Sequence, residues 1–200
     1  MAVKVTKVIV PTEPASSTEK CPTLGFFLES GHVRRGKLVL LKKLVYLSLG
    51  SNIGDRAGHL KAAIKHLESL GNVVAVSSFY ETEPVEVTAQ PWFLNGVVAL
   101  ETEKMPRQLI AAILDLEQEM GRRRVQKKGP RTIDIDILLF GNSVIDMPGL
   151  TVPHPAMHER RFVLQPLAEI APDVRHPVLK KSVRELLADL PSGQAVRKKN

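Results

Sequence analysis

The sequence feature that most limits how this chain can fold is the run IDIDI, which begins at Ile133. Apolar and acidic residues alternate in it, and a period of two residues is typical of a half-buried β-strand. The three isoleucines are therefore expected on a buried face, and Asp134 and Asp136 together on the opposite face. Two neighbouring carboxylates repel each other, so this face either points into solvent or binds cations. The run thus predicts a sheet strand with an acidic face.

Further strand and helix patterns surround this run. The predicted elements are a strand at 44–49, a helix with apolar positions Leu60, Ile64 and Leu67 that ends at Gly71, strands at 73–81 and 92–101, a helix at 106–120, and, after the acidic strand, helices at 162–170 and 182–190. This order predicts an α+β fold of the ferredoxin-like βαββαβ type, an antiparallel sheet with the helices packed on it. The extra C-terminal helices make it three-layered in outline, and the basic residues 197–199 are expected to fray. Such a fold serves many functions, so the function has to be argued from a site.

Length and composition limit the class of protein. Two hundred residues, of which 44% are hydrophobic, form one domain, or one domain with an appendage. The sequence has no apolar run long enough to cross a membrane. One cysteine, Cys21, excludes an internal disulfide and fits a reducing compartment. We therefore predict a cytoplasmic protein with no membrane partner. The expected oligomeric state is a monomer, although nothing in the composition determines it.

Residues 1–43 are predicted to be a poorly ordered N-terminal extension ahead of a domain at 44–200. A secretory signal is not indicated, because the start lacks a continuous apolar core followed by a cleavage site. A transit peptide and a start site placed too far upstream are the alternatives. The extension holds eight Lys or Arg against three Glu, which leaves 20 basic and 18 acidic side chains in the domain. This near balance argues against a nucleic-acid partner and for one focused anion site.

The cations of the domain gather just before the acidic strand, where six of the ten residues 122–131 are Arg or Lys. Mg²⁺ prefers oxygen ligands and usually takes one or two carboxylates plus substrate phosphates, while arginines neutralise phosphate oxygens. Gly121, Gly129 and Pro130 make the basic segment suitable as a mobile cover. A charge run is more often a solvated loop. Its position beside two carboxylates nevertheless favours phosphoryl transfer.

A few residues suggest a second half of the site. Phe93 lies two residues from Asn95 on the same strand face, and an aromatic ring beside an amide can hold a flat polar heterocycle. The alternative for Phe93 and Phe162 is an ordinary place in the core. His154, between two prolines, is either structural or a nucleotide contact.

The sequence KKGPRTIDIDIL at residues 127–138 resembles the signature of the hydroxymethyldihydropterin pyrophosphokinase family. The resemblance covers residues 44–175, and residues 1–43 have no counterpart in the family. The other matching segments follow in the family's order at 49–52, 77–82, 93–95, 152–154, 160–162, 166–167 and 169–172.

This resemblance implies an ATP- and Mg²⁺-dependent transferase of folate biosynthesis. Such an enzyme transfers the diphosphate of ATP to the hydroxymethyl group of 6-hydroxymethyl-7,8-dihydropterin and releases AMP. The implied catalytic residues are Arg122, Arg131 and Asp136, and the implied ligands of two Mg²⁺ ions are Asp134 and Asp136. The implied ATP-binding residues are Glu117, Arg122, Arg124, Arg131, Ile137, Thr151, His154 and Arg160. The implied pterin-binding residues are Gly50, Thr82, Val85, Phe93, Asn95 and Phe162.

Three positions depart from the family pattern. Lys128 stands where several members have an aromatic residue before Gly-Pro-Arg, Pro155 where an aromatic can follow the histidine, and Glu83 in place of a proline. None of these changes removes an expected metal ligand or Arg131.

Two other functions compete with this interpretation. A ferredoxin-like RNA-binding module would carry paired aromatics on its middle strands, which this sequence lacks, and its strand aspartates would repel a phosphate backbone. A nucleotidyltransferase could use the same metal pair on another acceptor. The products distinguish the enzymes, because a nucleotidyltransferase releases pyrophosphate and a pyrophosphokinase releases AMP.

Overall fold

The computed structural model describes residues 42–84, 90–122, 129–191 and 193–199. Its strands are β1 (Lys43–Ser51), β2 (Asn72–Val76), β3 (Tyr80–Thr82), β4 (Phe93–Thr102), β5 (Asp134–Phe140), β6 (Ile145–Met147), β7 (Leu150–Val152) and β8 (Val196–Lys198). Its helices are α1 (Arg56–Leu67), α2 (Pro106–Glu119), the 3₁₀ turn η1 (Met157–Glu159), α3 (Arg161–Ile170) and α4 (Val183–Asp189). No helix of the described part is long and apolar enough to cross a membrane.

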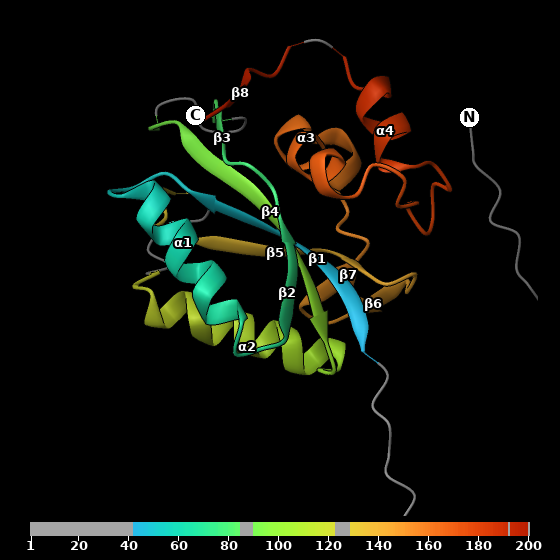
Figure 1. The fold of residues 1–200 in the computed structure, drawn as a ribbon, viewed down its shortest axis with the longest axis horizontal. Coiled ribbons are helices and arrows are strands. Elements are labelled where there is room, and N and C mark those ends of the chain that lie inside the picture. The colour runs from blue at the N-terminus through green and yellow to red at the C-terminus, as the bar shows by residue number, and fades with distance from the viewer. Residues whose placement is uncertain (1–41, 85–89, 123–128, 192, 200) are drawn as a thin grey trace, which may run out of the picture. The chain divides into compact units, whose positions relative to one another are not determined.

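One antiparallel sheet organises these elements (Figure 1). Its strand order is β5-β1-β4-β3-β8, and β2 also pairs with β4. The long strands β1 and β4 occupy the centre because they pair over their whole length, from Lys43 opposite Thr102 to Ser51 opposite Leu94. Strands β6 and β7 form a separate two-stranded hairpin. The predicted α+β class with an antiparallel sheet is confirmed.

Helices cover both faces of the sheet, with α1 and α2 on one side and α3 and α4 on the other (Figure 1). The α1/α2 side packs Leu60 and Ile113 against the apolar face of β1, β4 and β5. The other side packs Leu164 and Leu186 against Leu138 and its neighbours. Each face thus buries its own apolar cluster, which is the main source of stability in such a layered fold.

The ends of the helices follow local sequence signals. The side chain of Asp55 accepts a hydrogen bond from the Gly58 N–H at 2.9 Å and so caps α1. Pro106 opens α2, where its missing N–H needs no partner. Ser182 and Glu185 form a reciprocal capping box at the start of α4.

The structure corrects three details of the prediction. The strand expected at 73–81 is two strands, β2 and β3, with a break at residues 77–79. Helix α1 ends at Leu67 rather than at Gly71. The basic C-terminus is no frayed end, because Val196–Lys198 pairs with Tyr80–Thr82 as strand β8. A charged strand of three residues is too short for an alternating pattern to be recognised in the sequence. It forms by pairing its backbone with β3, a contact between distant parts of the chain.

The expected extension at 1–43 lies outside the described residues except for its last two positions, of which Lys43 begins β1. The boundary between extension and domain therefore stays a prediction.

Candidate active site

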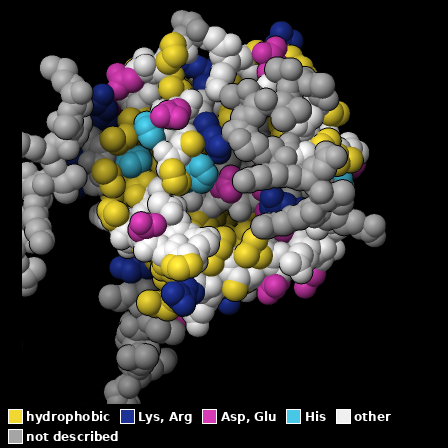
Figure 2. All heavy atoms as spheres, turned by 180° about the vertical axis from the view of Figure 1, so that it is seen from behind, with side chains coloured by type: hydrophobic (Ala, Val, Ile, Leu, Met, Phe, Trp, Pro, Cys, Tyr) yellow, Lys and Arg dark blue, Asp and Glu magenta, His cyan; other side chains and the backbone are white. Residues whose placement is uncertain are grey.

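A cavity of about 360 Å³ opens beside the acidic face of β5. It is lined by Ser48, Gly50, Thr82, Glu83, Pro84, Gln90, Phe93, Asn95, Arg122, Arg131, Asp134, Asp136, His154, Arg160 and Phe162. Figure 2 shows histidine, acidic and basic side chains close together near the middle of one face of the molecule. The cavity is therefore lined by both signs of charge and by aromatic rings.

The alternating pattern of β5 places its side chains as expected. Ile133, Ile135 and Ile137 are at most 3% exposed, whereas Asp134 and Asp136 reach the cavity. The sheet register puts Asp136 opposite Ser48 and Asp134 opposite Gly50, and Gly50 in turn lies opposite Asn95 on β4. Asp134, Gly50 and Asn95 thus lie side by side on three neighbouring strands, so the acidic face of β5 adjoins the predicted pterin contacts.

Gly50 is the close-approach point of this row. A Cβ atom at residue 50 would lie 2.8 Å from Oδ1 of Asn95, which is closer than real Cβ contacts allow. Asn95 cannot easily retreat, because its Nδ2 donates a 2.6 Å hydrogen bond to Oγ1 of Thr82. The glycine therefore leaves room for the amide that faces the cavity.

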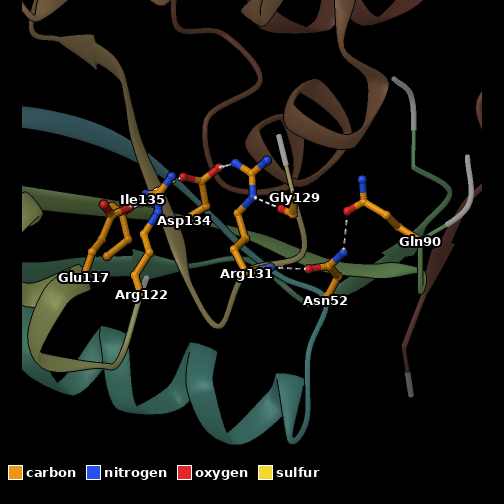
Figure 3. Close-up of polar contacts among 8 residues, drawn as sticks. All are labelled: Asn52, Gln90, Glu117, Arg122, Gly129, Arg131, Asp134 and Ile135. Atoms are coloured by element: carbon orange, nitrogen blue, oxygen red, sulfur yellow. Dashed lines mark hydrogen bonds and ion pairs between the residues drawn. The ribbon is translucent and has the colours of Figure 1, made fainter. Parts of the chain in front are cut away.

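Arginine side chains hold both oxygens of Asp134 (Figure 3). Nη1 of Arg122 lies 2.7 Å from Oδ1, and Nη1 of Arg131 is paired with Oδ2. The backbone of Arg131 is fixed by Asn52, whose Oδ1 accepts its N–H at 2.8 Å and whose own N–H donates to its carbonyl at 3.2 Å. Nδ2 of Asn52 also donates to Oε1 of Gln90 at 3.1 Å. The two guanidinium groups thus lie beside the Asp134 carboxylate, in a position from which they can also bind phosphate oxygens.

Glu117 supports this network from behind rather than lining the cavity. It is 2% exposed, accepts the Ile135 N–H at 2.7 Å and pairs with Nη1 of Arg122. Burial raises the pKa of Glu117, against the opposing effects of the Ile135 N–H and Arg122. The residue therefore ties α2 to β5 and orients Arg122.

Asp136 and His154 mark the border to a second cavity, of about 300 Å³, which both also line. Burial, and next the charge of Asp134, raises the pKa of Asp136. Burial lowers the pKa of His154, which favours its neutral ring. Its Nδ1 accepts the Ala156 N–H at 3.2 Å, so the ring proton of the neutral form is on Nε2. The second cavity is lined further by Ile110, Ile135, Ile137, Gly149, Leu150, Thr151 and Pro155.

An arginine lies over the ring of each of the two phenylalanines that are predicted to contact the pterin. The guanidinium carbon of Arg131 lies 6.0 Å from the ring centroid of Phe93, and that of Arg160 lies 5.6 Å from the centroid of Phe162. Both distances are within the range of cation–π attraction. The aromatic and the basic halves of the cavity are thus directly in contact.

Most of the predicted site residues lie in these two cavities. Ile137 and Thr151 line the second cavity alone, Glu117 lies behind the first, and Val85 and Arg124 lie outside the described residues, as does Lys128. The sequence did not point to Ser48, Pro84 and Gln90. Ser48 could have been found, because it precedes Gly50 by two residues and so shares its strand face. Pro84 and Gln90 lie in a connection without any periodic pattern.

The donor set suits Mg²⁺ if substrate completes it. Carboxylate oxygens of Asp134 and Asp136 are the ligands that this ion prefers. Among the residues that the structure describes, no group of three or more His, Cys, Asp or Glu could hold a metal by itself. A site of two carboxylates fits an ion that also binds phosphates.

Residues 46–172 match the model of the 7,8-dihydro-6-hydroxymethylpterin-pyrophosphokinase family. This chain belongs to that family. The match spans more than half of the 200 residues and includes every described residue of both cavities. The family predicted from the sequence motifs is therefore confirmed.

Named relatives agree with the family match. The chain is 46% identical over 149 residues to the 2-amino-4-hydroxy-6-hydroxymethyldihydropteridine pyrophosphokinase of Pseudomonas aeruginosa, which covers 74% of this chain and 91% of the relative. The enzyme of the same name from Methylorubrum extorquens is 47% identical over 151 residues, with 74% and 94% covered. The folic acid synthesis protein fol1 of Schizosaccharomyces pombe is 45% identical over 157 residues, or 78% of this chain. The chain spans only 21% of that longer protein.

A solved structure supports the fold. The wild-type Plasmodium falciparum HPPK-DHPS crystal structure with SDX-DHP superposes with a TM-score of 0.61 at 17% identity. The superposition covers 74% of this chain and 44% of the parasite chain. At this identity the similarity concerns the fold alone.

Proposed function

We propose that this protein transfers the diphosphate of ATP to 6-hydroxymethyl-7,8-dihydropterin in folate synthesis. The hydroxymethyl oxygen attacks the β-phosphorus, the bond from that phosphorus to the α-phosphate oxygen breaks, and AMP leaves while the hydroxyl loses its proton. Pyrophosphate transfer of this kind is the activity of the family to which the chain belongs. The observation that carries the proposal is one cavity that joins two aspartates, three arginines and two phenyl rings.

The carboxylates and arginines take the phosphoryl-transfer half of the reaction. Asp134 and Asp136 would hold two Mg²⁺ ions, which would neutralise the phosphate charge when bound. Asp136 is also assigned to accept a hydrogen bond from the attacking hydroxyl, because it lines the same cavity as the predicted pterin contacts Phe93 and Asn95. Arg122 and Arg131 exchange their contacts with Asp134 for phosphate oxygens and so stabilise charge that develops during transfer.

The second cavity is assigned to the nucleoside part of ATP. Ile137 offers an apolar wall there, while Thr151 and the Nε2–H of His154 offer polar contacts. Arg160, which lines the first cavity, is assigned to the phosphates of ATP, and Arg124 keeps its role as an ATP contact from the sequence resemblance. Glu117 acts through Arg122.

The other side of the first cavity is assigned to the pterin. Phe93 and Phe162 are the rings for stacking, and the side chains of Thr82 and Asn95 offer donors and acceptors to its polar edge. Gly50 provides the close backbone approach. Val85 keeps its role as a pterin contact from the sequence resemblance alone.

Several properties complete the proposal. The strand order β5-β1-β4-β2 with α1 and α2 on one face supports a ferredoxin-like sheet. A site assembled within one chain supports a monomer, and the single cysteine supports a cytoplasmic location. The domain is assigned to residues 44–200, with no nucleic acid or membrane as partner.

Product analysis tests the proposed function. The protein is incubated with ATP, Mg²⁺ and 6-hydroxymethyl-7,8-dihydropterin, and AMP and pyrophosphate are quantified. AMP formation that requires the pterin supports the proposal. Pyrophosphate release with transfer of the nucleotide would instead support a nucleotidyltransferase, and the absence of both products would reject either enzyme.

A further inference from the structure

The C-terminal segment 193–199 contacts the framework of the candidate active site, although it lies beyond the family match at 46–172. Strand β8 extends the sheet by pairing Val196 with Thr82 and Lys198 with Tyr80 (Figure 1). The Lys199 N–H continues this ladder with a 2.8 Å hydrogen bond to the Phe79 carbonyl. The segment therefore supports the strand that ends in a predicted pterin contact.

Side chains of the same segment contact the chain neighbours of Phe93 and Phe162, the two phenylalanines predicted to bind the pterin. The guanidinium carbon of Arg197 lies 5.2 Å from the ring centroid of Trp92, the residue before Phe93. Oε1 of Gln194 accepts the Arg161 N–H at 2.8 Å, one residue before Phe162. Nζ of Lys198 pairs with Glu169 of α3 at 3.1 Å.

We propose that the segment 193–199 is a clamp that positions the pterin half of the active site; this rests on the proposed function. It touches the three elements that carry Thr82, Phe93 and Phe162, each at the same residue or at its chain neighbour. Stacking of a flat heterocycle between two rings depends on their separation and tilt. A segment that links the chain neighbours of Phe93 and Phe162 to β3 fixes the separation and tilt of these two rings.

The clamp is selective for one substrate. Strand β5, His154 and the second cavity make no hydrogen bond or ion pair with residues 193–199 within the described part of the chain. Gln194 also adjoins Arg160 through Arg161, so loss of the clamp should weaken pterin binding much more than nucleotide binding. A segment that only stabilised the fold would weaken both to the same extent.

Two variants test the clamp, a truncation after Pro191 and the double variant Gln194→Ala/Arg197→Ala. The matched control is Lys199→Ala, whose side chain makes no hydrogen bond or ion pair within the described residues. KM for the pterin is measured by AMP formation, and Kd for a non-hydrolysable ATP analogue is measured by titration calorimetry. We expect the pterin KM to rise about tenfold in both variants, a size typical of lost ring stacking. The analogue Kd should change much less than the pterin KM, and both constants of Lys199→Ala should equal those of the full chain.

The outcomes separate the clamp from the proposed function. An unchanged pterin KM in the double variant, or a parallel rise of the pterin KM and the analogue Kd, overturns the clamp. If the truncated chain does not fold, the double variant decides, because Arg197 is exposed and Gln194 is only half-buried. If the full chain forms no AMP, the proposed function fails, and direct pterin binding followed by fluorescence then decides on the clamp.

Discussion

Glu169 gives the sharpest prediction of this structure. Its carboxylate accepts the N–H of Ser78 at 3.0 Å, the hydroxyl of Ser78 at 2.7 Å, the hydroxyl of Tyr80 at 2.9 Å and Nζ of Lys198 at 3.1 Å. These bonds join α3 to the β3 and β8 edge of the sheet. Although burial alone would raise it, the hydrogen bonds lower the pKa of Glu169 to about 2.

The lowered pKa makes the contribution of Glu169 depend on pH. Because the folded-state pKa is below the ordinary value of 4.5, stability is gained above pH 4.5 and is lost as the pH falls towards 2. This difference corresponds to an upper bound of roughly 3 kcal/mol. The side chain is 30% exposed, so solvent screens the bonds, and we expect about 1–2 kcal/mol. Glu169→Gln keeps the shape of the side chain and removes the charge.

The assay is urea unfolding of both proteins between pH 7 and pH 3. We expect Glu169→Gln to be less stable at pH 7, and the difference in unfolding free energy to narrow by about 1 kcal/mol at pH 3. Glu119→Gln, which removes an exposed carboxylate without a hydrogen bond or ion pair among the described residues, is the matched control. A difference that is the same at every pH would refute the role given to these hydrogen bonds.

Further predictions concern the site and the extension. Asp134→Asn and Asp136→Asn should each lower kcat by at least about 10²-fold without loss of melting temperature, and near-normal AMP formation in either would contradict their assignment. Gly50→Ala should raise the pterin KM, since its Cβ would lie 2.8 Å from Oδ1 of Asn95; an unchanged KM would show that the amide can move freely. Deletion of residues 1–41 should leave kcat and both KM values unchanged, whereas an insoluble or inactive product would make the extension part of the fold.

Local periodicity explains why much of the fold could be predicted from the sequence. The alternation in β5 determines which side chains are buried, because successive residues of any strand face opposite sides. The same argument places Phe93 and Asn95 together in the cavity. These inferences need no knowledge of the neighbouring strands, and the structure confirms them.

Long-range pairing explains what the sequence did not reveal. The break between β2 and β3 falls where Ser77 donates its N–H to the Val97 carbonyl at 2.9 Å, while its hydroxyl accepts the Val97 N–H at 2.9 Å. The Ser77 hydroxyl here accepts the N–H that a backbone carbonyl would accept in a regular β-ladder. No periodic sequence pattern predicts such a side-chain contact. Gln90 similarly enters the site through its bond to Asn52, far from it in the chain.

The contacts of Asp134 connect the observed network with the proposed reaction. A neighbouring pair of ionised aspartates is costly, and the two guanidinium groups on Asp134 offset that cost. Arg122 and Arg131 can leave Asp134 only if another cation replaces them there and another anion receives them. Phosphates that arrive together with their counter-ions satisfy both conditions at once, whereas a metal ion alone would leave the arginines facing a cation. Under the proposed function, the carboxylates and arginines therefore form one exchangeable set, which predicts that nucleotide and metal bind together.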